Sequence, residues 1–373
     1  MQTGGVKLEA VELRRVGLPL VAPFRTSFGI ETHRDALVVR VIGPGADGWG
    51  ECVSMIDPLY SSEYTDGVEH VVRHHLLPRL FALDEVTAAS AEQALEPVKG
   101  HRMAKAALQT AVLDAELREA GVSLAVHLGG VRDAVDAGVS VGIMSSIPTL
   151  LDAVAGYVAQ GYKRVKLKIE PGWDIEPVRA VRELIGGDML LQVDANTAYT
   201  LDDADHLAEL DAFDLLLIEQ PLPEDDLLGH AELATRIATP VCLDESISSA
   251  RDAATAIRLG AAAIINIKPG RVGGYHESRR IHDVCVANGI PVWCGGMLET
   301  GIGRAANVAL ASLPGFTLPG DTSASDRYFT RDITAPFELI DGQLRVPTAP
   351  GIGVDPIMAI LDELTTRIDT IRP

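Results

Sequence analysis

The chain has 373 residues, of which 47% are hydrophobic and 23% are charged, and its formal net charge at pH 7 is −20. This length and apolar content allow one large core or two unequal ones, which excludes a disulfide-dependent mini-protein. The charged content, and the lack of any run approaching the roughly 18 apolar residues that a membrane span needs, exclude a disordered chain and an integral membrane protein. The negative charge repels a phosphate backbone at long range, so nucleic acid is not expected as a partner.

The cysteines and the N-terminal stretch indicate the cellular compartment. The four cysteines, Cys52, Cys242, Cys285 and Cys294, are scattered and form no C-x-x-C pair, so reduced thiols are expected. The first ten residues are polar and lack the basic and apolar regions of a secretory signal. These features predict a cytoplasmic protein that does not interact with membranes.

Residues 1–130 have the signals of a separate α+β domain. Strand-forming residues at Leu37–Ile42 and Trp49–Val53 flank the turn Gly43–Gly45, which predicts an antiparallel meander. The stretch His101–Ala120 has apolar residues at three- and four-residue spacing and stops at Gly121, which predicts a helix ending at a C′ glycine.

Residues 131–325 alternate short β-rich runs with helical segments. This alternation predicts a parallel barrel with helices outside, whose active site lies at the C-terminal ends of its strands. Five of the runs close on a polar residue, and those residues follow one another at intervals of 26, 25, 25 and 24 positions: Lys168, Asp194, Glu219, Asp244 and Lys268. The expected strands are Val139–Ile143, Arg164–Ile169, Met189–Asp194, Asp214–Glu219, Pro240–Asp244, Ala263–Lys268, Pro291–Cys294 and, more weakly, Phe316–Leu318.

After residue 325 the pattern returns to mixed strand and helix, with a strand-like run at Phe337–Ile340 and a further element over Ile357–Ile371. We expect residues 326–373 to pack back against the N-terminal domain, which would then be discontinuous.

Three strand-ending carboxylates, Asp194, Glu219 and Asp244, offer only oxygen ligands at neighbouring positions of the barrel mouth. Such a set suits Mg²⁺ or Mn²⁺. Any one of them is more readily explained as a loop residue or a helix cap, but three in register favour a metal site. No histidine falls at a strand end among them, so a zinc hydrolase is not indicated.

Three lysines complete the constellation. Lys166 and Lys168 are two residues apart on one strand and therefore point to the same side, where their repulsion lowers the pKa toward that of a general base. Lys268 ends the sixth strand, which lies opposite the second in an eight-stranded barrel. Lysines on both sides of a substrate carbon, next to a divalent metal, fit removal of a proton adjacent to a carboxylate to give an enediolate.

These residues resemble the muconate-lactonising subgroup of the enolase superfamily over nearly the whole chain. The resemblance implies a modified TIM barrel, (β/α)7β, with a discontinuous α+β capping domain. Further segments are similar to the group that combines o-succinylbenzoate synthase and N-succinylamino acid (N-acylamino acid) racemase activities. These segments are Pro23–Phe28, Glu51–Met55 with Pro58–Tyr60, Val139–Ile143, Asp194–Asn196, Lys268–Arg271 and Trp293–Thr300.

The resemblance also implies residue roles. Lys168 and Lys268 would be the acid/base pair, assisted by Lys166, and the three carboxylates would bind Mg²⁺, with Mn²⁺ as a substitute. Arg271 would act on the pKa of Lys268, with an ordinary surface arginine as the equal alternative. The residues expected around a small carboxylate substrate are Ser140, Asn196, Gly296 and Met297 from the barrel, Phe24, Met55 and Tyr60 from the capping domain, and Arg271.

The implied activities are a lyase of menaquinone biosynthesis, an isomerase, or both, and the catalytic residues do not distinguish them. Relatives are often homo-octamers, so a homo-oligomer is expected. A muconate-type cycloisomerase and a non-catalytic ligand-binding relative stay as alternatives. Gly138–Gly142 satisfies G-x-S-x-G but continues as a strand, which argues against a serine hydrolase. Gly320–Ser323 lacks the acidic pair of dipeptide epimerases, and Val292–Gly296 lacks the histidine of mandelate racemases.

Overall fold

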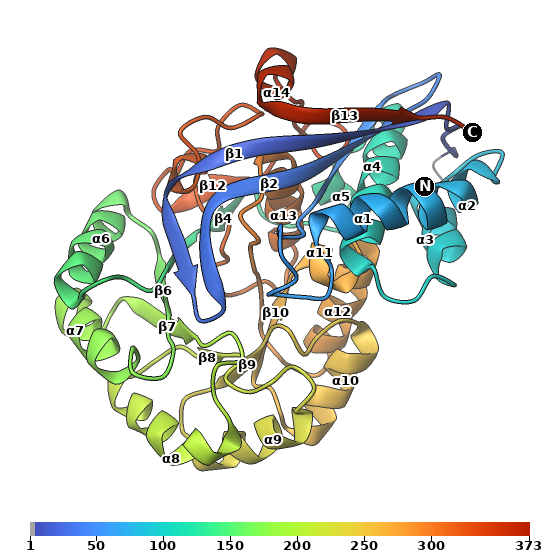
Figure 1. The fold of residues 1–373 in the computed structure, drawn as a ribbon. Coiled ribbons are helices and arrows are strands. Elements are labelled where there is room, and N and C mark those ends of the chain that lie inside the picture. Colours follow the sequence, from blue (N-terminus) through green and yellow to red (C-terminus); the bar gives the residue numbers. More distant parts are fainter. Residues whose placement is uncertain (1–3) are drawn as a thin grey trace.

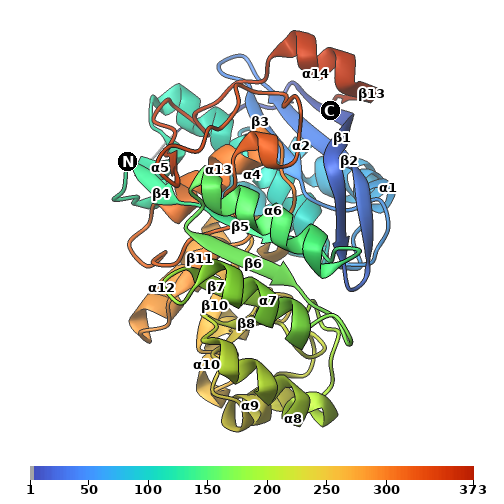
Figure 2. The same ribbon diagram turned by 90° about the vertical axis from the view of Figure 1, so that its left-hand side faces the viewer.

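The computed structural model describes residues 4–373, so residues 1–3 of the polar N-terminal stretch lie outside the described residues. An antiparallel sheet with its helices lies over one end of a parallel barrel (Figures 1 and 2). Among the described residues, no helix is both long enough and apolar enough to cross a membrane.

The capping sheet has the strand order β13-β1-β2-β3, and every neighbouring pair is antiparallel. The predicted meander is present. The strand expected at Leu37–Ile42 is the second half of a longer strand that begins at Gly29. The strands are β1 (Ala10–Thr26), β2 (Gly29–Ile42), β3 (Gly48–Cys52) and β13 (Thr365–Ile371). The helices of this part are α1 (Thr65–Val71), a π-helical turn (Val72–Leu76), α2 (Leu77–Phe81), α3 (Ala88–Leu95) and α4 (Arg102–Ala120).

Helix α4 lies directly on β3. It ends at Gly121, which adopts φ +67°, as the sequence predicts. A Cβ atom on Gly50 would come within 2.2 Å of the Ala107 carbonyl oxygen, and one on Gly48 within 2.0 Å of the Ala111 carbonyl oxygen. The strand and the alanine-rich helix therefore touch backbone to backbone, which only glycine permits at these two positions.

The barrel is a seven-stranded parallel sheet in which neighbours in space are also neighbours in sequence. Its strands are β5 (Gly138–Val141), β6 (Arg164–Lys168), β7 (Leu190–Asp194), β8 (Ile218–Glu219), β9 (Val241–Leu243), β10 (Ile264–Ile267) and β11 (Val292–Cys294). All seven lie within the runs expected from the sequence, apart from the first residue of β5.

The expected eighth strand at Phe316–Leu318 is less regular than predicted. The segment makes one parallel bridge from Phe316 to Val292 and another from Gly320 to Ala137, so it closes the gap between β11 and β5 without forming a continuous ladder. Pro319 has no N–H to donate, which explains why the ladder is interrupted here.

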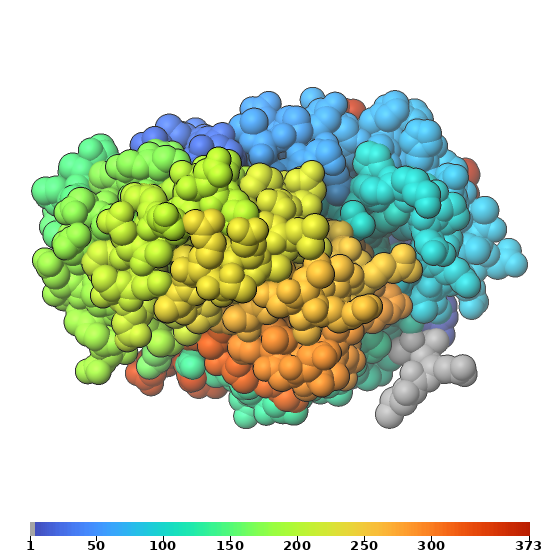
Figure 3. All heavy atoms as spheres, turned by 90° about the horizontal axis from the view of Figure 1, so that it is seen from below, coloured from blue at the N-terminus to red at the C-terminus, as the bar shows by residue number. Residues whose placement is uncertain are grey.

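Helices surround the barrel and form one continuous face of the molecule, with capping residues in blue and cyan along its edge (Figure 3). They are α6 (Ile147–Gln160), α7 (Ile175–Ile185), α8 (Ala204–Leu207) between 3-10 turns at Leu201–Asp203 and Ala208–Phe213, α9 (Leu227–Arg236), α10 (Ala250–Leu259), α11 (Pro269–Val272), α12 (Tyr275–Ala287) and α13 (Gly301–Ala311). Shorter elements are α5 (Leu124–Leu128), the pair β4 (Ala134–Asp136) and β12 (Gln343–Arg345), and a 3-10 turn at Ser325–Arg327.

The tail differs from the expected pattern in two places. Phe337–Ile340 contributes only one bridge, from Ile340 to Gln343, because the next two residues form a tight turn in which Asp341 and Gly342 both have positive φ. Ile357–Ile371 divides into helix α14 (Met358–Leu364) and strand β13, which pairs with β1. The β-branched residues of β13 favour the extended conformation.

Two sets of polar contacts hold the capping part over the barrel. The β1–β2 hairpin reaches down to the strand ends (Figure 1), where Ser27 Oγ donates to the Ala195 carbonyl at 3.1 Å. Glu51 of β3 accepts hydrogen bonds from the backbone N–H groups of Thr300 and Gly303, each at 3.0 Å, at the start of α13. A carboxylate at a helix N-terminus satisfies free N–H groups and complements the helix dipole. Together these contacts enclose a space above the barrel strands.

The close approach of β3 to α4 generates a stability prediction. Gly50→Ala should lower the free energy of unfolding by about 1–3 kcal/mol or more, because the new methyl group overlaps backbone atoms that cannot move alone. Gly156→Ala is the matched control: Gly156 is exposed in the middle of α6 with no atom within 4 Å of its ideal Cβ position. It should be neutral or stabilise by up to about 1 kcal/mol. Urea unfolding measures both, and equal effects would contradict the described contact.

Candidate active site

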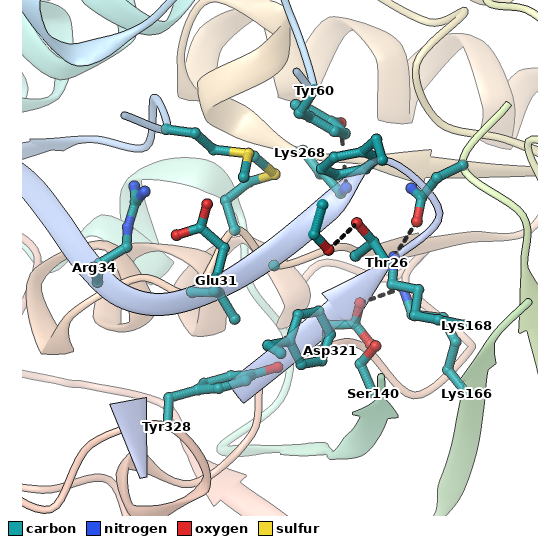
Figure 4. Close-up of a pocket in the computed structure, with 18 residues that line it drawn as sticks. Thr26, Glu31, Arg34, Tyr60, Ser140, Lys166, Lys168, Lys268, Asp321 and Tyr328 are labelled. Carbon is teal, nitrogen blue, oxygen red and sulfur yellow. Dashed lines mark hydrogen bonds and ion pairs between the residues drawn. The ribbon is translucent and has the colours of Figure 1, made fainter. Parts of the chain in front are cut away.

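A small pocket lies between the capping part and the C-terminal ends of the barrel strands (Figure 4). Lys166 and Lys168 of β6 and Lys268, which follows β10, all line it. The other expected residues in its wall are Phe24, Met55, Tyr60, Ser140, Asn196, Gly296 and Met297. The structure thus brings together in one cavity residues that are as far apart in sequence as Phe24 and Met297.

Lys166 is the most heavily paired of the three lysines. Its side chain is 2% exposed, and its Nζ lies 2.6 Å from Asp321 Oδ2, 3.0 Å from Glu219 Oε2 and 3.3 Å from Asp194 Oδ2. Burial alone would lower the pKa of Lys166, but these carboxylates outweigh it and raise the pKa above its usual value. Lys166 is therefore held as a fixed positive charge.

Lys168 has fewer anionic neighbours. Its Nζ donates to Asp194 Oδ2 at 2.6 Å and to Asn196 Oδ1 at 2.7 Å. Burial, with a contribution from the nearby charge of Lys166, lowers the pKa of Lys168 below its ordinary value despite the Asp194 carboxylate. This direction agrees with the prediction that Lys166 makes its neighbour a better base.

Lys268 is held from both parts of the molecule. Its Nζ lies 2.6 Å from Asp244 Oδ2 and 3.2 Å from the Tyr60 hydroxyl, and it sits 4.7 Å from the centre of the Tyr60 ring. Burial lowers the pKa of Lys268, but Tyr60 and the surrounding carboxylates raise it to above its usual value. The expected lowering of this pKa by Arg271 is therefore not the dominant effect.

Arg271 does not line the pocket, contrary to its expected place among the substrate-binding residues. Its guanidinium is buried behind Asp244, with which it forms an ion pair, and donates to the carbonyls of Ile247 at 2.8 Å and Asn266 at 2.7 Å. Arg271 lies in α11, which begins directly after Lys268, and all of these contacts are to residues outside that helix.

The three expected metal ligands are fully buried below the lysines. Asp194 and Glu219 are paired residues of the neighbouring strands β7 and β8, and Asp244 follows β9. Within residues 4–373, no three carboxylate, imidazole or thiol side chains are arranged so that they could hold a metal ion. The three carboxylates form ion pairs with lysine side chains instead.

The donor chemistry nevertheless fits a divalent cation. The set consists of buried oxygen donors, and Oε2 of the adjacent Glu245 has no hydrogen-bond partner. Burial, followed by the charge of Asp194, raises the pKa of Glu245 to about 7. A hard divalent cation among these oxygens would relieve both the unmet acceptor and the mutual repulsion of the carboxylates.

Strained backbone positions surround the strand ends. Asn196, two residues beyond β7, has φ +43°, and Gln220, directly after β8, has φ +38°. Both side chains have fixed partners: Asn196 binds Lys168, and Gln220 Oε1 accepts from the backbone N–H groups of Asp244 and Ser246 at 3.0 and 3.2 Å. Such conformations persist only where neighbouring contacts enforce them, and they are common in active sites.

Sequence reasoning missed Asp321, Glu31, Arg34 and Tyr328, which also line the pocket. Asp321 lies in the irregular closing segment and bonds both Lys166 and Arg164, the latter at 2.9 Å. Its signal was visible as a lone carboxylate next to Gly320, at the position of an eighth strand end. Glu31 and Arg34 lie in a charged stretch of β2 that gave no sign of facing a cavity.

Comparison with known proteins finds relatives over nearly the whole chain. The family described as mandelate racemase / muconate lactonizing enzyme, N-terminal domain, matches residues 9–129, and the family described as enolase C-terminal domain-like matches residues 149–360. The chain is 68% identical to an N-succinylamino acid racemase from an Amycolatopsis species, covering 97% of this chain and 98% of the relative. It is 47% identical to an o-succinylbenzoate synthase from Geobacillus kaustophilus, covering 94% of each. The crystal structure of an enolase superfamily member from Listeria innocua superposes with a TM-score of 0.94 at 40% identity, covering 98% of this chain and 99% of the other.

The ion pairs of Lys166 generate a second stability prediction. Lys166→Met should lower the free energy of unfolding by about 3–5 kcal/mol in the presence of chelator, because it leaves buried carboxylates without their counter-charge. Lys163→Met, three residues earlier and exposed, should change it by no more than about 0.5 kcal/mol. Chemical unfolding of both variants provides the measurement, and a fully stable Lys166 variant would refute this account of the buried charges.

Proposed function

The chain belongs to the mandelate racemase / muconate lactonizing enzyme group of the enolase superfamily, and we propose that it removes and returns the proton on the carbon next to a carboxylate, as an N-succinylamino acid racemase, an o-succinylbenzoate synthase, or both. The observation that carries this proposal is the placement of Lys168 and Lys268. Lys168 ends the second strand of the barrel, Lys268 directly follows the sixth, and both line one pocket.

In racemisation the two lysines exchange roles. The lysine that is neutral takes the α-proton from one face of the substrate, and the lysine on the other side, as an ammonium group, delivers a proton to the opposite face. The lowered pKa of Lys168 supports its role as a base. Asn196 and Tyr60 hold the two Nζ atoms in place through neutral oxygens, so each lysine keeps its position when its charge changes.

In the synthase reaction the same geometry works from one side. Lys168 removes the proton and returns it to the departing hydroxyl group, and the ammonium group of Lys268 stabilises the negative charge that develops on the substrate. The 68% identity to the Amycolatopsis racemase supports the racemase activity, and the 47% identity to the Geobacillus synthase supports the lyase activity.

We further propose that Asp194, Glu219 and Asp244 hold Mg²⁺, with Mn²⁺ as a substitute. Members of this superfamily typically use a divalent metal. When bound, the metal would hold the substrate carboxylate and share the charge that forms on its oxygens. The chain's own contribution is to hold these carboxylates close together, with Lys166 beside them.

Metal removal tests this assignment. Chelation should abolish turnover, and Mg²⁺ or Mn²⁺ should restore it. Glu219→Gln should weaken Mn²⁺ binding, followed by electron paramagnetic resonance, by at least about 10-fold, since even loss of an outer partner of a metal site has an effect of that size. Glu224→Gln, on the exposed loop after β8, is the matched control and should bind normally. Full activity in excess chelator, with no metal detected in the protein, would overturn the assignment.

Proton exchange separates the roles of the two lysines. Lys168→Ala and Lys268→Ala should both abolish net racemisation, yet each should leave exchange of the α-proton with solvent deuterium on only one enantiomer, and the two variants should retain opposite ones. Single-turnover exchange on D- and L-N-succinylphenylalanine, with the exposed Lys163→Ala as control, provides the measurement. A variant that still exchanges both enantiomers at wild-type rates would refute the two-base arrangement.

A further inference from the structure

Three histidines gather on the surface of the capping part, outside the pocket. His70 belongs to helix α1 (Figure 1), and His74 and His75 belong to the π-helical turn that follows it. All three residues are exposed. In the part of the chain that the structure describes, no hydrogen bond or ion pair engages their rings, which contact one another. Their nitrogen atoms are therefore accessible to a ligand from solution.

The π turn explains why these side chains lie together. Pro78 has no N–H to donate to the carbonyl of His74, as an α-helix would require, and a proline of this kind distorts the helix before it. The N–H of Leu77 bonds to the carbonyl five residues earlier in the chain, instead of four. Because this turn contains an additional residue, both His74 and His75 come to lie next to His70.

The distances between the rings distinguish one pair. The ring centres of His70 and His74 are 4.7 Å apart, whereas those of His70 and His75 are 6.0 Å apart. Two histidines four positions apart on one face of a helix are a known arrangement for binding a transition metal. At the shorter separation, one nitrogen of each ring can reach a common ion at the usual bond length of about 2.0–2.1 Å.

We propose that His70 and His74 bind a divalent transition-metal ion, of the class of Cu²⁺, Zn²⁺ and Ni²⁺, at a site separate from the active site. Imidazole nitrogen suits these ions, whereas the carboxylates of the active site suit Mg²⁺ and Mn²⁺. No third carboxylate, imidazole or thiol completes the set among residues 4–373, so water fills the remaining positions around the ion. The proposal does not depend on the function proposed above.

A bound ion would stabilise the helix that anchors part of the pocket wall. Thr65, the first residue of α1, donates to the Met55 carbonyl from its backbone N–H at 2.9 Å and from its hydroxyl at 3.0 Å. Met55 in turn lines the pocket. An ion that joins His70 to His74 binds the folded helix more tightly than the unfolded chain, in which the two rings are not held together, and so stabilises the folded form.

Copper binding tests the site. Cu²⁺ alone is the probe, added to Mg²⁺-saturated full-length protein, and electron paramagnetic resonance detects nitrogen ligands through their splitting of the spectrum. The wild type should bind one Cu²⁺ with imidazole nitrogen ligands. His70→Gln and His74→Gln should each weaken this binding by at least about 10-fold, since even loss of an outer partner of a metal site has an effect of that size.

Two controls make the result specific. His75→Gln removes the exposed neighbour with the more distant ring, and His33→Gln removes an exposed histidine of β2, so both variants should bind Cu²⁺ as the wild type does. Because all four positions are exposed, the circular dichroism spectrum should stay unchanged throughout. Wild-type binding in either His70→Gln or His74→Gln would overturn the proposed pair. An equal loss of binding in His33→Gln would also overturn it, because the ion would then bind elsewhere.

Discussion

The requirement that buried charges be neutralised governs the architecture around the pocket. Lys166, Lys168 and Lys268 are almost fully removed from solvent, and so are the carboxylates beneath them. Each charge taken out of water costs several kcal/mol unless it is paired and hydrogen-bonded. At the strand ends of the barrel, three adjacent carboxylates, Asp194, Glu219 and Asp244, are therefore paired with the ammonium groups of the lysines, and the rest of the site is built on this array.

Residues from parts of the chain that lie far apart in sequence contact this array. Asp321 pairs with Lys166 and with Arg164, which ties the irregular closing segment to the second strand. Tyr60 brings the capping part to Lys268 and Asp244 through hydrogen bonds of 3.2 Å. The same contacts that balance charge also close the barrel and seat the cap, so stability and the geometry of the site depend on the same side chains.

Much of this arrangement can be predicted from local sequence, and the reasons for the exceptions are physical. The regular spacing of Lys168, Asp194, Glu219, Asp244 and Lys268 reports a repeating strand and helix, which is a local property. Asp321 could not be placed in the same way, because its segment forms single bridges and has no strand periodicity. Arg34 could not be assigned to the pocket, because the register of a long antiparallel strand decides which side chains face inward. Whether Arg271 lines the pocket could not be predicted either, because that residue lies in the four-residue helix α11, whose direction the local sequence does not indicate.

The pairing of β1 with β13 has a consequence for biosynthesis. The Thr366 hydroxyl bonds the Arg15 carbonyl, 351 positions away in the chain. The strand that carries Phe24 into the pocket thus leaves the ribosome long before its outer neighbour exists, and the whole barrel is made in the interval. Until then the outer edge of β1 has no partner strand, and exposed edges of this kind invite pairing with other chains. Nascent chains that stall late in translation, after the barrel but before β13, are therefore the form of this protein most exposed to aggregation and most in need of a chaperone.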